Sequence, residues 1–332
     1  MQNAPQKGEV MKGKAILVIF VVLVAFILPF LLLPEAGNVP KTQQAAMQTE
    51  TTKSTDTPQV SFDGGLLLRI ETADGMEELS LHDYLTGVVL AEMPTDFAPE
   101  ALKAQAVASR TYALRKMAAG KHTGADICGS FACCQAWTPT QEFAGTEALA
   151  RAESAVSDTD GLVVTYGGEL IDATFFSCAA GMTEAAAAVW GSDVPYLQAV
   201  ESPEHEERYE ESVTFSAAEF AERLAHPEAD LSGNPTEWFG EEKRTAGGGL
   251  ESIRIGGITI CGTELRSRLS LRSTVMSFSA AEDSVTVTTS GYGHRVGLSQ
   301  YGADALAQEG ESFEEILLHY YQGTEIRRLY TA

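Results

Sequence analysis

Glu92 occupies an unusual position for a charged side chain. The apolar residues Leu81, Leu85 and Val88 before it recur at steps of three and four, which is typical of the buried face of a helix. One further turn places Glu92 on this same face, just before Pro94 ends the pattern. Burying a carboxylate costs free energy, so such a group is paired with a base, lies at the edge of the core, or marks a functional site. Glu92 is therefore our leading candidate for a functional carboxylate.

Two cations lie on one face of the helix that follows. Lys103 and Arg110 alternate there with Val107 and Leu114, because residues seven positions apart nearly coincide around a helix. A basic stripe of this kind usually faces solvent. Since both cations are close in sequence to Glu92, the alternative is that they hold its carboxylate or contact a bound substrate.

A short loop after this helix collects metal-binding side chains. Three sulfurs and one imidazole at short spacing are the ligand types of a closed, structural zinc site. The spacing is not that of a standard zinc finger, and outside the cytoplasm the same cysteines could form disulfides instead, so both readings stay open on the residues alone. Cys178 and Cys261 are either small buried apolar residues or a further bridge. The four candidate ligands are His122, Cys128, Cys133 and Cys134.

A glycine-rich stretch near the C-terminus, 291–310, offers polar and aromatic side chains beside an accessible backbone. An aromatic face binds the C–H edge of a sugar while nearby polar groups take its hydroxyls. We expect Tyr292, His294, Gln300 and Tyr301 to contact a polar polymer. The alternative is a packed junction between a loop and a helix, since glycine often marks turns alone.

The elements that must position these groups can be read from local patterns. A hairpin is expected over 65–79, followed by a helix with Ser80 as its N-cap and Asp83 three residues later. The second helix is expected to begin at Pro99 and to end at Gly120. These two helices would bring Glu92 and the cations into one region.

The rest of the globular part alternates between strand and helix patterns. Two strands within 160–176 are joined by Gly167-Gly168, and a final helix is expected after the glycine-rich stretch. The pattern predicts an α+β fold of mixed helices and antiparallel strands. The remaining expectations are an amphipathic helix over 213–225, a polar loop over 227–249, and strands over 250–260, 273–280 and 284–289.

The charge of the chain excludes one broad class of partner. Its 332 residues carry 23 basic and 46 acidic side chains, a formal net charge of −23. A general nucleic-acid-binding protein needs a basic surface to neutralise phosphates. We therefore expect no nucleic-acid partner, and binding through a local site.

The N-terminus indicates membrane attachment. The stretch 15–33 is uncharged and apolar, and roughly 20 such residues span a bilayer core. The charged side chains of 1–14 are mostly lysines, which places that end in the cytoplasm. We expect an uncleaved single-pass transmembrane helix over a cleaved signal peptide, because the run is long and no clear cleavage site follows. The Thr-, Gln- and Pro-rich segment 34–60 then serves as a flexible linker to an extracytoplasmic domain, 61–332.

Several long motifs in order resemble a known family. They are AEMPTDFAPEALKAQAVASRTYAL, FFSCAAGMTE with VWGSDVPYLQAV, and GYGH followed by VGLSQYGADALAQEG. From about residue 60 to the C-terminus the chain resembles the stage II sporulation protein D family. The resemblance implies a membrane-anchored lytic transglycosylase that cleaves MurNAc–GlcNAc bonds of peptidoglycan, preferably on strands stripped of stem peptides, during engulfment. It also implies a cell-wall amidase and a membrane protein of the engulfment machinery as partners.

The resemblance assigns roles to several residues. Glu92 matches the catalytic acid of the family's E-M-P motif, and the Cys/His cluster matches its zinc loop, with Cys133 where the family often has histidine. Arg295 stands where the family usually has glycine, so we expect either backbone strain or a different loop there. Because a cation close to Glu92 would favour its ionised form, Lys103 and Arg110 are expected either at substrate oxygens or at Glu92 after it has donated its proton. The further groove contacts expected are Gln135, Ser177, Tyr196, His294, Gln300 and Tyr301.

A lytic transglycosylase needs one carboxyl group, which acts first as an acid and then as a base. An ordinary glycosidase needs two carboxylates. A lone Glu92 on an apolar helix face, with its pKa raised by burial, suits the one-carboxyl reaction. The alternatives are a non-catalytic wall-binding enhancer of an amidase, or a zinc hydrolase, which would need an open metal position that a set of three sulfurs and one imidazole does not leave.

Overall fold

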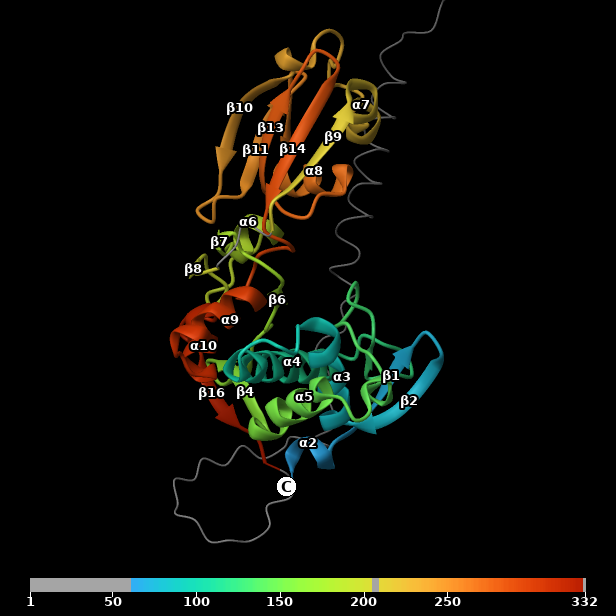
Figure 1. Ribbon diagram of the computed structural model, residues 1–332, viewed down its shortest axis with the longest axis vertical. Helices are drawn as coiled ribbons and strands as arrows, with labels where there is room; N and C mark the ends of the chain where they lie inside the picture. Colours follow the sequence, from blue (N-terminus) through green and yellow to red (C-terminus); the bar gives the residue numbers. More distant parts are fainter. Residues whose placement is uncertain (1–60, 205–208, 331–332) are drawn as a thin grey trace, which may run out of the picture. The chain divides into compact units, whose positions relative to one another are not determined.

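The computed structural model describes residues 61–204 and 209–330. The expected transmembrane helix over 15–33 and the linker over 34–60 lie outside these residues. Among the described residues, no helix is both long and apolar enough to cross a membrane. Helices and mostly antiparallel strands alternate along them, which confirms the expected α+β class (Figure 1).

Two consecutive helices form the centre of the first core, α3 (Leu81–Glu92) and α4 (Pro99–Ala119). The Ser80 hydroxyl caps α3 by accepting from the Asp83 amide at 3.0 Å, as the sequence predicts. Proline opens α4, and Gly120 ends it with a left-handed φ of 62°, a conformation that glycine adopts at little cost.

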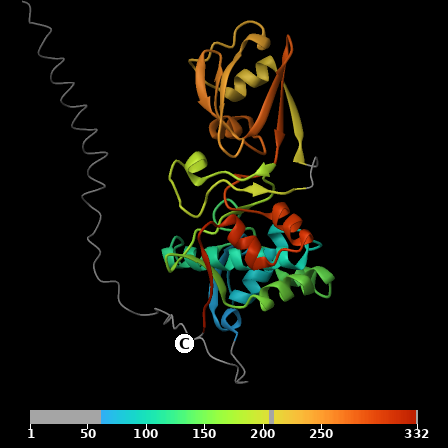
Figure 2. The same cartoon turned by 90° about the vertical axis from the view of Figure 1, so that its left-hand side faces the viewer.

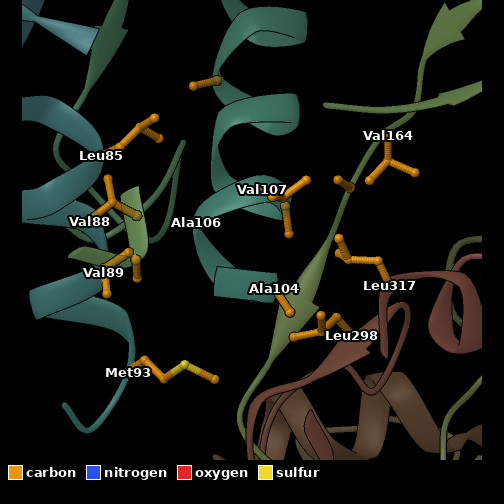
Figure 3. Packing of buried hydrophobic residues seen from close by; sticks show 14 of the residues in the cluster. Leu85, Val88, Val89, Met93, Ala104, Ala106, Val107, Val164, Leu298 and Leu317 are labelled. Carbon is orange, nitrogen blue, oxygen red and sulfur yellow. The ribbon is translucent and has the colours of Figure 1, made fainter. Parts of the chain in front are cut away.

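Alanine lets α4 pack closely on several sides. Ala104 and Ala106 are fully buried, and α3, α5 (Glu147–Asp158), α9 (Gln300–Glu309) and α10 (Phe313–Tyr320) all contact the helix. Small side chains allow the helix axes to approach, and larger apolar residues from the neighbours fill the space between them. Figure 3 shows α3 packing with Leu85, Val88 and Val89, and strand and helix residues Val164, Leu298 and Leu317 on the other side of α4.

Short strands surround this core. The expected hairpin is present as β1 (Leu67–Thr72) and β2 (Gly75–Ser80), and β3 (Ile127–Cys128) joins β1 in parallel. Strand β4 (Leu162–Tyr166) pairs with β5 (Glu169–Leu170) and with the C-terminal strand β16 (Glu325–Arg328), which the sequence patterns did not reveal.

The second of the two strands expected within 160–176 is interrupted. Strands β4 and β5 form the expected hairpin at Gly167-Gly168, but β5 ends at Leu170. The next strand, β6 (Phe175–Phe176), pairs in parallel with β15 (Leu298–Ser299). An isolated antiparallel bridge between Cys178 and Tyr292 adds a second link between these two segments. The loop after β6 is therefore held against the glycine-rich stretch, more than a hundred residues later in the chain.

A second, separate core lies within 211–290. Strands β9 (Glu211–Ser216), β13 (Val275–Ala280) and β14 (Ser284–Ser290) form one antiparallel sheet. The other antiparallel sheet contains β10 (Phe239–Arg244), β11 (Leu250–Ile255) and β12 (Ile258–Cys261). Helices α7 (Ala217–Leu224) and α8 (Gly262–Leu269) contact each other and these strands (Figures 1 and 2).

Three sequence predictions are only partly right in this region. The expected helix over 213–225 begins only after Ser216, because 213–216 completes strand β9 beside β14. The expected loop over 227–249 contains strand β10, which is extended because it pairs with β11. The expected strand over 250–260 is a hairpin, because the chain turns at Gly256-Gly257, where both glycines have positive φ.

Candidate functional site

Glu92 lines a cavity of about 510 Å³. Its walls come from segments far apart in sequence: the ends of α3 and α6 (Ala186–Trp190), the loop after β6, the glycine-rich stretch and the first residue of α9. No other described residue that lines this cavity carries a carboxylate, a lysine amine or an arginine guanidinium. The lining residues are Glu92, Tyr112, Phe131, Cys134, Thr174, Phe175, Phe176, Ser177, Trp190, Tyr292, Gly293, His294 and Gln300.

The surroundings of Glu92 favour its neutral form. Burial raises the pKa of its carboxyl above the ordinary value of 4.5, although hydrogen bonds from the Ala136 amide and the Gln300 side chain act in the opposite direction. The Ala136 N–H lies 2.6 Å from Glu92 Oε1 and fixes the carboxyl orientation. No ion pair to Glu92 is present among the described residues, so no paired cation opposes the effect of burial.

Arg110 is not a substrate contact, which corrects the sequence prediction. Its guanidinium is fully buried and pairs with buried Asp63 at 2.5 Å. Further hydrogen bonds go to the carbonyls of Val156 and Leu162. Because all these partners are internal, Arg110 joins the helix α2 (Phe62–Gly65) to the first core.

Lys103 is likewise absent from the Glu92 cavity. Its amine pairs with Glu100 at 2.9 Å and with Asp158 at 3.6 Å, and it lines a different, smaller cavity. The cations that could have kept Glu92 ionised are therefore engaged elsewhere.

The predicted metal ligands converge. One ligand atom from each of His122, Cys128, Cys133 and Cys134 lies within 4.8 Å of the others, and the three cysteines carry free thiols. His122 Nε2 is 3.1 Å from Cys134 Sγ and 3.8 Å from Cys133 Sγ. Neighbouring ligand atoms around tetrahedral zinc are separated by about 3.6–3.8 Å, given its usual bond lengths. The donor set fits such an ion.

Residues around the cluster match this chemistry. Glu71 Oε2 lies 3.8 Å from Nδ1 of His122, the nitrogen that faces away from the sulfurs. A carboxylate in that place orients a ligand imidazole. The Lys121 amine donates to Cys133 Sγ at 3.0 Å and offsets negative charge on the sulfur. Cys134 also lines the Glu92 cavity, two residues before the Ala136 amide that binds Glu92.

His294 stands in the cavity as a neutral side chain. Burial and the nearby Arg266 guanidinium lower its pKa to about 4. Its Nδ1 accepts from the Val296 amide at 3.1 Å. A neutral imidazole in this place adds no charge beside Glu92.

Of the other predicted contacts, some line the cavity and others do not. Ser177, His294 and Gln300 line the cavity as expected. Gln135 is buried and accepts from Tyr84, while its amide nitrogen has no partner among the described residues. Gln135 does not line the cavity, which corrects the sequence prediction.

Two tyrosines predicted as groove contacts have structural partners instead. The Tyr196 hydroxyl accepts from the Asp172 amide at 3.0 Å. The Tyr301 ring packs edge-on against Phe97 with ring centroids 4.7 Å apart. Neither residue lines the Glu92 cavity.

Sequence reasoning missed most of the aromatic lining. Phe131, Trp190 and Tyr292 expose 82%, 45% and 50% of their surface, which is unusual for large apolar side chains. Tyr292 was singled out, but the other two follow no helical or strand period. Exposed rings around a cavity suit the apolar faces of sugars. A signal was available in their neighbours, because Phe131 lies in the loop of candidate metal ligands and Trp190 directly precedes a glycine that ends α6.

Arg295 adopts the left-handed backbone that glycine would favour, with φ of 65°. The guanidinium is fully buried, pairs with Glu184 Oε1 at 3.1 Å and donates to the carbonyls of Met182 and Gly247 at 2.6 Å each. These bonds offset the backbone strain. They also tie the glycine-rich stretch to β7 (Gly181–Met182) and to the loop between β10 and β11 in the second core.

The sequence was compared with known proteins. A family model described as Stage II sporulation protein matches residues 70–166. Stage II sporulation protein D of Bacillus subtilis (strain 168) is 36% identical over 320 residues, which cover 93% of this chain and 92% of that protein. The same-named protein of Bacillus amyloliquefaciens is 37% identical over 263 residues, 76% of this chain and 75% of that one.

A more distant relative carries a different name. The Amidase enhancer of Bacillus subtilis (strain 168) is 29% identical over 295 residues, which cover 73% of this chain and 40% of that protein. The match to the sporulation proteins extends over nearly the whole length of both chains and includes the motifs around Glu92. The chain therefore belongs to the stage II sporulation protein D family.

Proposed function

We propose that this protein is a lytic transglycosylase that cleaves MurNAc–GlcNAc bonds of peptidoglycan during sporulation. The observation that carries the proposal is the isolation of Glu92, which is the single carboxylate among the described residues that line an aromatic-walled cavity. A hydrolase of the usual kind needs a second carboxylate to activate water or form a covalent intermediate. A single acid suffices when the sugar's own hydroxyl replaces water.

The reaction runs in two proton transfers. Protonated Glu92 donates its proton to the glycosidic oxygen as the bond from C1 of MurNAc breaks, which leaves positive charge on the ring. The resulting carboxylate then accepts the proton of the C6 hydroxyl while the C6 oxygen bonds to C1. The products are a 1,6-anhydro-MurNAc end and a free GlcNAc hydroxyl, and Glu92 regains its proton.

The cavity matches the needs of both steps. Burial keeps Glu92 protonated to a higher pH, and the Ala136 amide stabilises the carboxylate once the proton has left. Gln300 and neutral His294 provide polar groups for sugar hydroxyls.

A zinc ion fits the Cys/His cluster in a structural role. His122, Cys128, Cys133 and Cys134 would hold it, and it would supply cross-linking of the loop that they form. The loop in turn holds the Ala136 amide against Glu92. All four positions are taken by protein side chains, so the proposed zinc has no role as a hydrolytic centre.

The proposal includes the cellular setting. A single transmembrane helix over 15–33 would anchor the domain outside the membrane with its N-terminus in the cytoplasm. A cell-wall amidase and a membrane protein of the engulfment machinery are the proposed partners, and strands without stem peptides are the proposed substrate.

The test uses purified glycan strands freed of stem peptides. Incubation with the protein should yield 1,6-anhydro-MurNAc ends in mass spectrometry. These products should vanish with Glu92→Gln and persist with Glu100→Gln, which alters a partly exposed glutamate that pairs with Lys103 outside the cavity. Reducing ends, or intact strands with the wild-type protein, would overturn the proposal.

A second function is favoured by the Amidase enhancer relative. A protein of that kind would bind the wall and accelerate an amidase without cutting glycan. Adding the chain to a cell-wall amidase should then increase stem-peptide release equally for the wild type and Glu92→Gln, with no anhydro ends. The enzyme reading requires Glu92-dependent cleavage in the absence of any amidase.

A further inference from the structure

A second cavity, of about 620 Å³, adjoins the Glu92 cavity. The two share one wall residue, Tyr292, and the Arg266 guanidinium in the second cavity is close enough to His294 in the first to lower its pKa. A polymer that occupies the Glu92 cavity can therefore continue across Tyr292. The residues that line the second cavity are Glu211, Thr263, Arg266, Ser267, Ser270, Leu271, Arg272 and Tyr292.

Arg266 is an unpaired, half-buried cation. Its Nε donates to the Leu271 carbonyl at 3.2 Å, and no carboxylate among the described residues forms an ion pair with it. In a chain with a net charge of −23, acidic partners are plentiful. A guanidinium left without one at a cavity wall is therefore available to an anion from outside the protein.

Arg272 adds a second cation with a different role. It pairs with Glu211 at 2.8 Å, and its guanidinium carbon lies 5.6 Å from the centre of the Tyr292 ring. This arrangement holds the half-exposed ring at the boundary between the cavities, where it can stack on a sugar. Two arginines and one glutamate leave the second cavity with net positive charge.

We propose that the second cavity is a subsite of the glycan groove, in which Arg266 binds a carboxylate of the strand. The proposal rests on the proposed function for its substrate. In peptidoglycan, carboxylates come from two sources: the lactyl group of MurNAc when no peptide is attached, and the stem peptide when one is.

The lactyl carboxylate is the better match. It sits directly on the sugar and is displayed at every second residue of a stripped strand, so a strand that crosses Tyr292 presents it close to the groove wall. Three hydroxyl side chains, Thr263, Ser267 and Ser270, line the same cavity as Arg266 and can satisfy the remaining oxygens. This subsite would make the enzyme select strands by the charge that removal of the peptide exposes.

The test measures binding of glycan to the full-length chain in the Glu92→Gln background, so that no cleavage occurs. The probes are stripped strands of defined length, the same strands with lactyl carboxylates converted to methylamides, and strands that retain stem peptides. Stripped strands should bind about tenfold more tightly than the methylamides, as a charge-assisted hydrogen bond predicts.

Substitutions assign the effect to Arg266. Arg266→Gln should bring both probes to the same affinity, and Arg266→Lys should keep part of the difference. The matched control is Arg268→Gln, which removes a cation of the same helix that is already paired with Glu264 at 2.7 Å and should leave the difference intact. Because the probe comparison is made first on unaltered Arg266, it does not depend on how the variants fold.

Three results would overturn the proposal. The first is equal affinity for carboxylate strands and methylamide strands. The second is an equal loss of affinity for both probes with Arg266→Gln. The third is Arg266-dependent binding of peptide-bearing strands that is as tight as the binding of stripped strands. The last result would assign the carboxylate to the stem peptide. Charge-dependent binding without any cleavage by the wild type would instead contradict only the proposed enzyme function.

Discussion

Asp63 and Glu92 are two carboxylates of the first core, and the free-energy cost of burying a carboxylate is offset differently in each. Asp63 is fully buried and pairs with the equally buried guanidinium of Arg110. Glu92 also lies on a helix face otherwise filled by apolar residues, yet its partners are an amide and a glutamine, and no cation among the described residues pairs with it. A paired buried charge holds structure in place, whereas an unpaired carboxyl in a cavity is left free to exchange its proton.

The largest effect expected from this comparison is on catalysis. Glu92→Gln removes the exchangeable proton without changing size, and the rate of glycan cleavage should fall at least about 10²- to 10⁴-fold. The fold should remain intact, as followed by circular dichroism. Asp63→Asn should instead lower the stability of the fold. If cleavage falls only in proportion to the fraction of unfolded protein, the role of Asp63 is structural.

Breaking the buried pair should cost much of the stability of the domain. Arg110→Ala leaves the Asp63 carboxylate buried without its cation, and the free energy of unfolding should fall by about 3–5 kcal/mol. Urea denaturation of the full chain measures this. A loss below about 1 kcal/mol would show that Arg110 is not the internal clamp described above.

Removal of the metal should impair the function of Glu92 indirectly, through the loop that carries Ala136. A chelator that withdraws zinc from the Cys/His cluster should lower the melting temperature and release the loop that carries Ala136, with activity falling about 10- to 100-fold. Elemental analysis should find one zinc per chain, absent in Cys128→Ser. Full activity and unchanged melting after complete removal would contradict the proposed role.

The raised pKa of Glu92 also predicts how stability depends on pH. A carboxyl whose pKa is raised by folding binds its proton more tightly in the folded state, so its favourable contribution is complete below the unfolded value near 4.5 and is lost as pH rises through the folded value. Glu92→Gln should therefore gain stability relative to the wild type from pH 4.5 upward. Parallel stability curves for the two proteins would be inconsistent with a raised pKa.

The smallest effect is expected at Lys103. Its ion pairs with Glu100 and Asp158 are partly exposed, so Lys103→Gln should change the free energy of unfolding by less than about 1 kcal/mol. Cleavage should stay within about twofold of the wild type. A tenfold loss of activity would restore Lys103 as a substrate contact.

The same comparison explains what the sequence could reveal. The apolar stripe of α3 and its Ser80 cap are local features, and they predicted the helix and the partly buried position of Glu92 correctly. Four metal-binding side chains in one short loop were equally local, and they do meet. The partner of Arg110 was hidden, because Asp63 belongs to a short helix before the hairpin and carries no pattern of its own.

The features that the sequence patterns did not predict depend on contacts between segments far apart in the chain. The aromatic walls of the Glu92 cavity come from segments far apart in sequence, among them β6 and the glycine-rich stretch, which meet when β6 pairs with β15. Strand β9 is extended because β14 lies beside it, although its sequence runs on into a helical pattern. Periodicity reports a residue's immediate neighbours and cannot report such pairings.

The most direct test of the account is the pKa of Glu92 itself. A ¹³C NMR titration of glutamate side-chain carboxyls would identify its signal by its absence in Glu92→Gln. The account predicts a midpoint above 4.5, matched by a fall in cleavage rate as pH rises through the same value. A midpoint at or below 4.5 would mean that Glu92 is an ordinary carboxylate near neutral pH and would contradict its role as the single acid.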